Sequence, residues 1–133
     1  ALAGCTPVTL DNDPSFDFAR WSVVYVAPID GAGRSAEEFL VARLRDQAGF
    51  KRVVTEPSPD VNCILYVRVD VTEDYDSDGD VEYDAVARFR VESAFDGSII
   101  DSGTADDDSG FYEEAVEEAL DDISLHYLRP YRL

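Results

Sequence analysis

The residue types in this 133-residue chain that could do chemistry are mainly carboxylates, and their sharpest pattern lies in residues 74–82. That segment reads Asp-Tyr-Asp-Ser-Asp-Gly-Asp-Val-Glu. Carboxylates on alternate residues, followed by a glycine that permits a sharp turn, are how calcium-binding loops gather oxygen ligands around one cation. We therefore predict a calcium site here and no other cofactor. Its candidate ligands are Asp74, Asp76, Asp78, Asp80 and Glu82.

The same segment departs from a complete calcium loop of the EF-hand type. The twelfth position, where such a loop has a bidentate glutamate, is Ala85, and a strand pattern follows in place of a helix. Glu82 could supply part of that coordination. The alternative interpretation is an acidic, solvated hairpin tip in which Asp and Gly serve as turn formers. The sequence leaves both interpretations open.

Three other polar groups are less specific. Residues 106–108 form a second acidic cluster, which we expect to cap the last helix and to interact with its dipole. The turn at residues 31–35 lacks the lysine of a phosphate-binding loop, and Glu37 and Glu38 follow it, so we predict no anion site. His126 is expected on the polar surface of the last helix. No carboxylate pair or nucleophile is marked by its pattern, so the sequence predicts no catalytic residue and no enzyme.

The two cysteines, Cys5 and Cys63, are too few, with a single histidine, for a zinc site. Cys5 ends the tetrapeptide Leu2-Ala3-Gly4-Cys5, which resembles the lipobox that closes the signal peptide of a bacterial lipoprotein. The resemblance implies a lipid on Cys5 and a place in the bacterial cell envelope, at the outer membrane, in the periplasm or facing the surface. The alternative is an extracellular chain that begins at Ala1 after removal of an ordinary secretory signal, with Cys5 free to pair with Cys63.

Charge excludes several classes of partner. Asp and Glu number 29 against 11 Lys and Arg, a net charge of −18 that repels nucleic-acid phosphates and anionic lipid head groups. No apolar run approaches the roughly 20 residues of a membrane span, so we expect membrane contact only through a lipid anchor. The surface is then solvated, screened by divalent cations, or matched to a basic partner.

The chain divides into a leader, residues 1–20, and a single domain, residues 21–133. In the domain, Ser35 and Glu38 form a capping box that predicts a helix running to about Ala48, with Gly49 as its stop. Apolar residues at helical spacing predict a second helix over about residues 110–128.

Strand patterns occupy the rest of the domain. Alternation of apolar and polar residues predicts two long antiparallel strands with one solvent-exposed face. An Asp-Gly turn leads into a further strand. The expected order is β-α-β-β-β-β-α. It predicts an α+β fold, a mixed and mainly antiparallel sheet of four to five strands with two helices on one face. The expected strands are residues 21–29, 50–55, 61–72, 81–92 and 98–102.

Aromatic residues near both ends are candidates for an interface. Phe16 and Phe18 alternate in the leader as a strand would, and Tyr127 and Tyr131 lie in an apolar, arginine-bearing tail. In so acidic a protein we expect such ends to contact a neighbouring copy or another protein. The alternative for the tail is packing on its own sheet.

The order of elements, together with the lipobox, resembles a group of small envelope lipoproteins. This group includes the curli-secretion lipoprotein, the amino-terminal domain of TolB and the lipoprotein activators of penicillin-binding proteins. The matching stretches are residues 23–29, 50–54, 60–67 and 95–100. The resemblance implies a non-catalytic lipoprotein that acts as a binding or assembly module. The alternative is a secreted subunit of an extracellular homopolymer, stabilised by calcium and docking through its leader.

Overall fold

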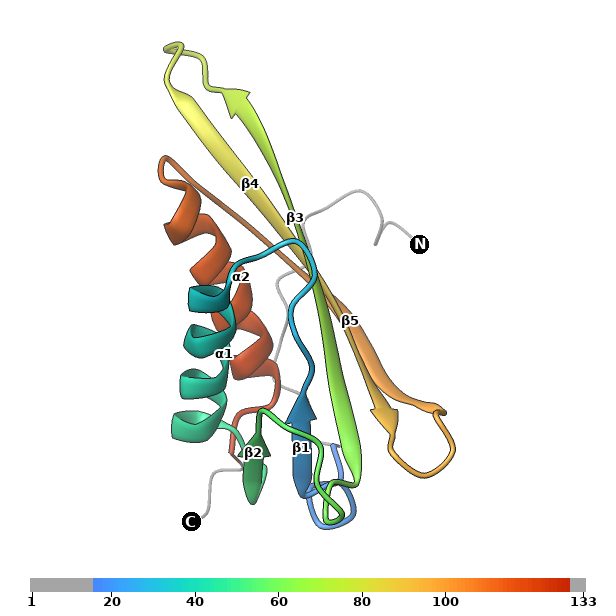
Figure 1. Cartoon of the computed structure of the whole chain (residues 1–133). Coiled ribbons are helices and arrows are strands. Elements are labelled where there is room, and N and C mark those ends of the chain that lie inside the picture. Colours follow the sequence, from blue (N-terminus) through green and yellow to red (C-terminus); the bar gives the residue numbers. More distant parts are fainter. Residues whose placement is uncertain (1–15, 130–133) are drawn as a thin grey trace.

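The computed structural model describes residues 16–129, which form one five-stranded sheet with two helices on one of its faces (Figure 1). The strands lie in the order β2-β1-β3-β4-β5. The predicted α+β class and order of elements are confirmed. The elements are β1 (Val23–Val26), α1 (Arg34–Gln47), β2 (Arg52–Val54), β3 (Cys63–Tyr75), β4 (Val81–Ser93), β5 (Ile99–Ser109) and α2 (Tyr112–His126).

The sheet is mixed because its two halves arise from different connections. β1 pairs in parallel with β2, which it reaches through α1, and in parallel with β3. The β3–β4 and β4–β5 pairs are antiparallel, as hairpins must be. The order therefore leaves β2 and β5 as the two edge strands.

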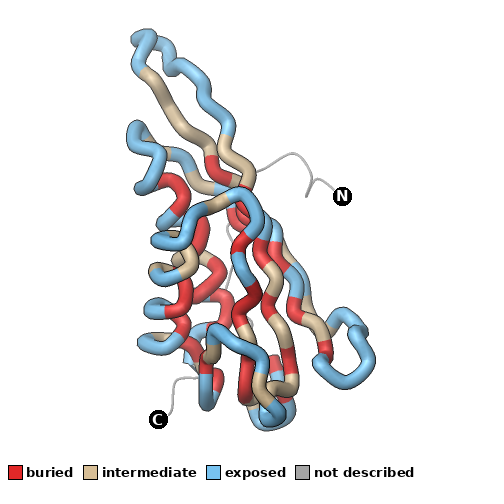
Figure 2. Tube along the Cα trace, viewed as in Figure 1, coloured by how far each residue is buried: buried red, intermediate tan, exposed pale blue. Residues whose placement is uncertain are grey.

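The core lies between the helices and one face of the sheet. Inward positions of β3 and β4 alternate as predicted, and Figure 2 shows the buried residues along the strands and the inner sides of the helices. Leu40 and Leu44 of α1 and Leu120 and Ile123 of α2 are completely buried. Such apolar stripes supply most of a helix's stability in a small domain.

The start of α1 differs from the prediction, whereas its end agrees with it. The helix begins at Arg34 with an extended Gly33 as its N-cap, whose carbonyl accepts hydrogen bonds from the amides of Ala36 and Glu37. Ser35 is therefore already inside the helix, no side chain caps it, and the predicted capping box is wrong. The physical reason is that the Gly33 carbonyl accepts the first hydrogen bonds of the helix, so the first turn already contains Ser35.

Gly49 directly follows the C-cap of α1, Ala48, at the place of the predicted stop. It is not among the described glycines with positive φ, and its amide donates to the Tyr127 carbonyl at 2.9 Å. A Cβ atom at this position would lie 2.6 Å from the Phe18 ring. Close packing against an aromatic side chain thus accounts for the glycine.

Strand β5 is longer than predicted, because it continues to Ser109. Residues 106–108 pair with β4, so the expectation that they cap the last helix is wrong. The N-cap of α2 is Phe111, which makes no side-chain cap hydrogen bond. Asp is a poor strand former by itself, and here the long partner strand β4 and the buried Ala105 decide the conformation.

The β3–β4 hairpin projects beyond the helices and beyond β5 (Figure 1). Its last register pair is Tyr75 with Val81, whereas β5 ends opposite Tyr83. The turn uses Gly79 at φ +82°. None of the described helices is long and apolar enough to cross a membrane.

Candidate functional site

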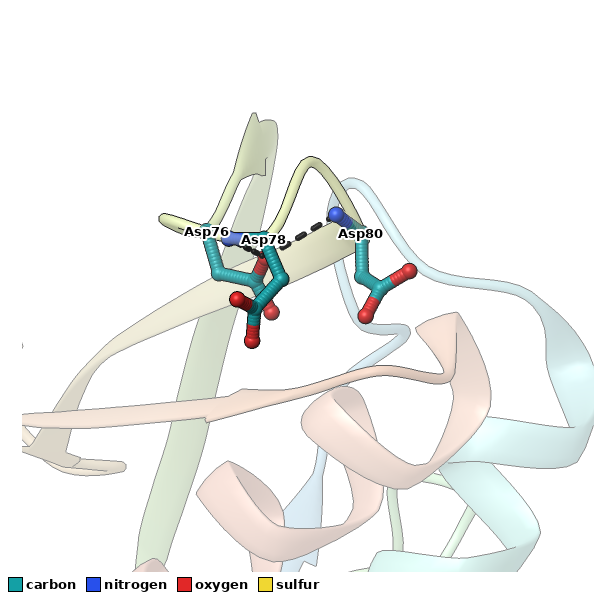
Figure 3. A group of neighbouring side chains, drawn as sticks. All are labelled: Asp76, Asp78 and Asp80. Carbon is teal, nitrogen blue, oxygen red and sulfur yellow. Dashed lines mark hydrogen bonds between the residues drawn. The ribbon is translucent and has the colours of Figure 1, made fainter.

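The tip of the projecting hairpin brings three of the predicted metal ligands together (Figure 3). Ligand oxygens of Asp76, Asp78 and Asp80 all lie within 4.8 Å of one another, and the three side chains are exposed. Asp76 Oδ1 also accepts hydrogen bonds from the amides of Asp78 and Asp80, both at 2.9 Å. The turn-forming role of Asp76 and a gathering of hard oxygen ligands therefore coexist, and the trio could hold a metal ion.

The other two predicted ligands lie elsewhere. Asp74 and Glu82 are register partners on β3 and β4, and they line a shallow cavity on the strands below the tip. The structure thus divides the predicted set of five into a trio at the tip and a pair on the strands. The cavity is lined by Asp74, Glu82, Asp84, Asp106, Asp107 and Asp108.

The carboxyl groups of this cavity share protons across β4 and β5. A hydrogen bond with Asp106, then burial and the charge of Asp106, raise the pKa of Asp84 to about 6. The corresponding hydrogen bond and charge of Asp108 raise the pKa of Glu82. Like charges held side by side favour the state in which one partner is protonated.

Asp107 points to the other side of β5, toward α2. Burial, followed by a hydrogen bond with Asp122 and the charge of that residue, raises the pKa of Asp107 to about 7. One of its two oxygens, Oδ2, is buried and has no hydrogen-bond partner among the described residues. Burial raises the pKa of Glu118, and the charges of Glu114 and Asp107 add to this shift.

Sequence reasoning missed this acidic group because it ended the strand at Ser102. A usable signal was present, since Asp106 and Asp108 alternate in the same way as Glu82 and Asp84 of the preceding strand. Extending the hairpin register beyond Ser102 would have placed the four carboxylates on one face.

His126 is buried, so its predicted place on the polar surface is wrong. Its Nε2 lies 3.0 Å from Asp101 Oδ2, and the Tyr127 hydroxyl donates to the same oxygen at 2.9 Å. Burial alone would raise the pKa of Asp101, but these hydrogen bonds outweigh it and lower the pKa. The helical period carried the signal, because His126 follows the buried Ile123 by three residues.

The predicted interface aromatics pack inside the protein's own fold. Phe16 and Tyr127 are buried and in edge-on contact at 5.0 Å, and Phe18 and Phe50 complete the cluster. These rings cover one end of the core, Phe16 and Tyr127 as buried and Phe18 as partly buried side chains, and an interface that involves them stays a prediction. Tyr131 lies outside the described residues.

The cysteine predictions concern one described residue. Cys63 is completely buried and forms no disulfide with another described residue. Burial raises the pKa of its thiol to about 12, so the thiol is a poor nucleophile. Cys5, with the rest of the lipobox, lies outside the described residues. Its lipidation and its pairing with Cys63 stay predictions.

Comparison with known proteins reveals a likeness of fold. No protein-family model matches the chain, and no sequence relative was found among curated proteins. Among solved structures, the PelC dodecamer from Paraburkholderia phytofirmans matches 84% of this chain and 91% of its own, with a TM-score of 0.66 and 19% identity. The minor lipoprotein from Acinetobacter baumannii matches 78% of this chain and 85% of its own, with a TM-score of 0.53 and 12% identity.

A third match is the lipoprotein GNA1162 from Neisseria meningitidis, over 66% of this chain and 83% of its own, with a TM-score of 0.51 and 14% identity. The likeness is one of fold. Bacterial lipoproteins are thus among the solved structures that share this architecture, as the sequence predicts for the wider group. The narrower likeness to the curli-secretion, TolB and penicillin-binding-protein activator groups stays a prediction.

Proposed function

We propose that the protein is a non-catalytic lipoprotein of the bacterial cell envelope that works as a self-assembling module. The observation that carries this proposal is the likeness of fold to the PelC dodecamer, which spans most of both chains. The tetrapeptide Leu2-Ala3-Gly4-Cys5 supplies the anchoring part of the proposal.

The chemistry of the described residues supports a role without catalysis. The Cys63 thiol is buried and has a pKa of about 12. The imidazole of His126 is buried and bound to Asp101. The most perturbed carboxyl groups face one another across β4, β5 and α2. A binding or assembly role uses such a surface without a reaction.

Two measurements on the native protein test the proposal. Mass spectrometry of the protein from its host membrane should find a diacyl or triacyl mass on Cys5. Light scattering on the full-length delipidated chain should find a homo-oligomer. An unmodified amino terminus at Ala1 would contradict the anchor, and a monomer at all concentrations would contradict self-assembly.

The alternative, a secreted subunit that docks through its leader, is weakened by one observation. Phe16 and Phe18, two of the apolar anchors available to such a leader, pack against Phe50 of the same chain. Deleting residues 1–15 keeps both rings. We expect this variant to fold and to retain the oligomeric state of the full-length chain, whereas a leader-mediated polymer would dissociate.

The ion that the hairpin tip would take is calcium. Three exposed carboxylates within 4.8 Å offer the hard oxygen ligands that calcium prefers. Because they are exposed and lack a bidentate glutamate at the twelfth position, we expect weak binding, in the millimolar range of extracellular calcium modules.

A further inference from the structure

The two edges of the sheet carry opposite charge. Edge strand β2 and helix α1, with the turn between them, fall in residues 34–54, which contain five basic and three acidic side chains, a net charge of +2. Edge strand β5 and helix α2 fall in residues 99–126, which contain ten acidic side chains and neither Lys nor Arg. β2 and β5 lie at opposite ends of the strand order, and α1 and α2 lie side by side on the face between them (Figure 1). The charges on the two edge strands therefore lie on opposite flanks of the molecule.

The acidic flank consists of Asp107, Asp108, Glu114, Glu118 and Asp122. The three α2 residues are spaced four apart and therefore share one face of the helix. Asp107 of β5 meets this face through Asp122, and the charges of Asp107 and Asp108 act on Glu118. None of the five takes part in an ion pair between residues that the structure describes.

The same helix also carries a carboxylate that has a basic partner within the chain. Asp121, on the side of α2 that faces α1, lies 3.4 Å from Arg43 and accepts a hydrogen bond from Gln47. The five carboxylates on the β5 side have no such counterpart among the described residues. Burial and then the charges of neighbouring carboxylates raise the pKa of Asp107 and Glu118. The repulsion among these carboxylates is relieved when a positively charged surface covers them.

The basic flank offers a surface of the required sign. A groove along the free edge of β2 is lined by charged and apolar groups. Arg45 donates two hydrogen bonds to the Val53 carbonyl, at 3.0 and 3.1 Å, and so holds its guanidinium at this edge. Lys51 and Arg52 are exposed beside it, and Arg52 forms an ion pair with Asp60 of the same chain, which leaves Lys51 as the cation without a recorded ion pair among the described residues. The lining residues are Arg45, Phe50, Lys51, Arg52, Val53 and Val54.

We infer that the β2–α1 flank of one copy docks on the β5–α2 flank of the next copy. The inference rests on the self-assembly proposed above, and it names the two surfaces involved. Like flanks repel each other, so a contact between two acidic edges is disfavoured and the charges select a head-to-tail arrangement. A head-to-tail contact is heterologous, and its repetition closes a ring when the rotation permits or extends a filament when it does not.

Two charge-reversal variants of the full-length chain test the pairing. The first carries Lys51→Glu and Arg52→Glu and has two acidic flanks. The second carries Glu114→Lys and Glu118→Lys, which puts two positive charges in the centre of the acidic flank and lowers the net charge of residues 99–126 from −10 to −6. All four side chains are exposed, so we expect both variants to fold, with unchanged circular dichroism. Each variant alone should self-associate at least tenfold more weakly than the wild type.

An equimolar mixture of the two variants should assemble again, because the reversed flanks complement each other in alternation. The matched controls place the same charge changes away from the flanks. Arg68→Glu with Arg88→Glu changes the open sheet face, and Asp78→Lys with Asp80→Lys changes the hairpin tip. Both controls should assemble like the wild type in sedimentation velocity.

The outcomes separate the two proposals. A wild-type chain that is monomeric at every concentration overturns self-assembly and the flank contact together. A wild-type oligomer whose flank variants assemble unchanged overturns the flank contact alone. Two further outcomes also overturn the flank contact. One is loss of assembly in the Glu114→Lys/Glu118→Lys variant alone, and the other is a mixture of the two variants that stays monomeric. Either outcome indicates that the acidic flank pairs with a different cation.

Discussion

At the scale of single residues, Asp107 shows how the acidic surface destabilises the fold. Its pKa is raised from 3.8 to about 7, so the folded protein holds a proton that the unfolded chain releases between these values. The free energy of unfolding therefore falls as the pH rises across this window. The side chain keeps part of its contact with solvent, which screens the effect.

We predict that Asp107→Asn stabilises the protein above pH 7 by about 1 kcal/mol, after discounting for solvent screening. The amide removes a charge and can donate to Asp122. Chemical denaturation from pH 4 to pH 8 should show a flatter profile than the wild type, with little gain at pH 4. Asp46→Asn on the exposed side of α1 is the control, and an equal gain there would refute the assignment to Asp107.

Gly49 is the second residue with a consequence that can be measured. Gly49→Ala places a Cβ atom 2.6 Å from the Phe18 ring, which must shift within an aromatic cluster. Overpacking of this kind costs about 1–3 kcal/mol. Thermal unfolding should show a lower Tm than for Gly110→Ala, where a Cβ atom meets nothing within 4 Å. Equal melting temperatures for the two variants would contradict the packing argument.

At the scale of elements, the β3–β4 hairpin tests the calcium proposal. Millimolar calcium at constant ionic strength should raise the Tm, because an ion shared by Asp76, Asp78 and Asp80 binds the folded state. Asp76→Asn should remove most of this gain.

A matched control lies in the next hairpin. Asp96 has the same turn-forming role, since its Oδ1 accepts a hydrogen bond from the Ser98 amide at 2.9 Å. Asp96→Asn changes the same charge at a similar turn, and we expect it to retain the calcium response. A wild-type Tm that does not respond to calcium would show that the hairpin tip is a turn without a calcium site. An equal loss of the calcium response in both variants would show the same.

At the scale of the whole molecule, a net charge of −18 makes ionic strength a determinant of stability. Screening weakens repulsion between exposed charges over distances beyond about 10 Å at 0.1 M salt. We predict that raising NaCl from about 0.02 M to about 0.5 M increases the Tm by several degrees.

The measurement uses a dilute solution of the Lys51→Glu/Arg52→Glu variant, so that self-association does not contribute to the Tm. Replacing residues 106–108 by Asn should reduce the dependence on salt, because it removes three carboxyl groups from the two faces of β5. A Tm that is independent of salt would show that the carboxylates are already neutralised.

The fold class follows from local patterns in the sequence. The backbone imposes a periodicity on burial, which appears as alternation along β3 and β4 and as the helical period of α2. The Asp-Gly turn at residues 96–97 is a third local pattern. These patterns were sufficient for the order of elements and for the side of each long strand that faces the core.

The site needed contacts that no local pattern encodes. Residues 106–108 became a strand because β4 offered a partner for their backbone, and that pairing gathered carboxylates from three elements. His126 became buried because Asp101, 25 residues earlier, supplied its hydrogen bond. The sequence by itself determined the net charge and the periodic helices and strands. The sheet order decided that opposite charges lie on opposite flanks, because tertiary packing determines which strands become neighbours.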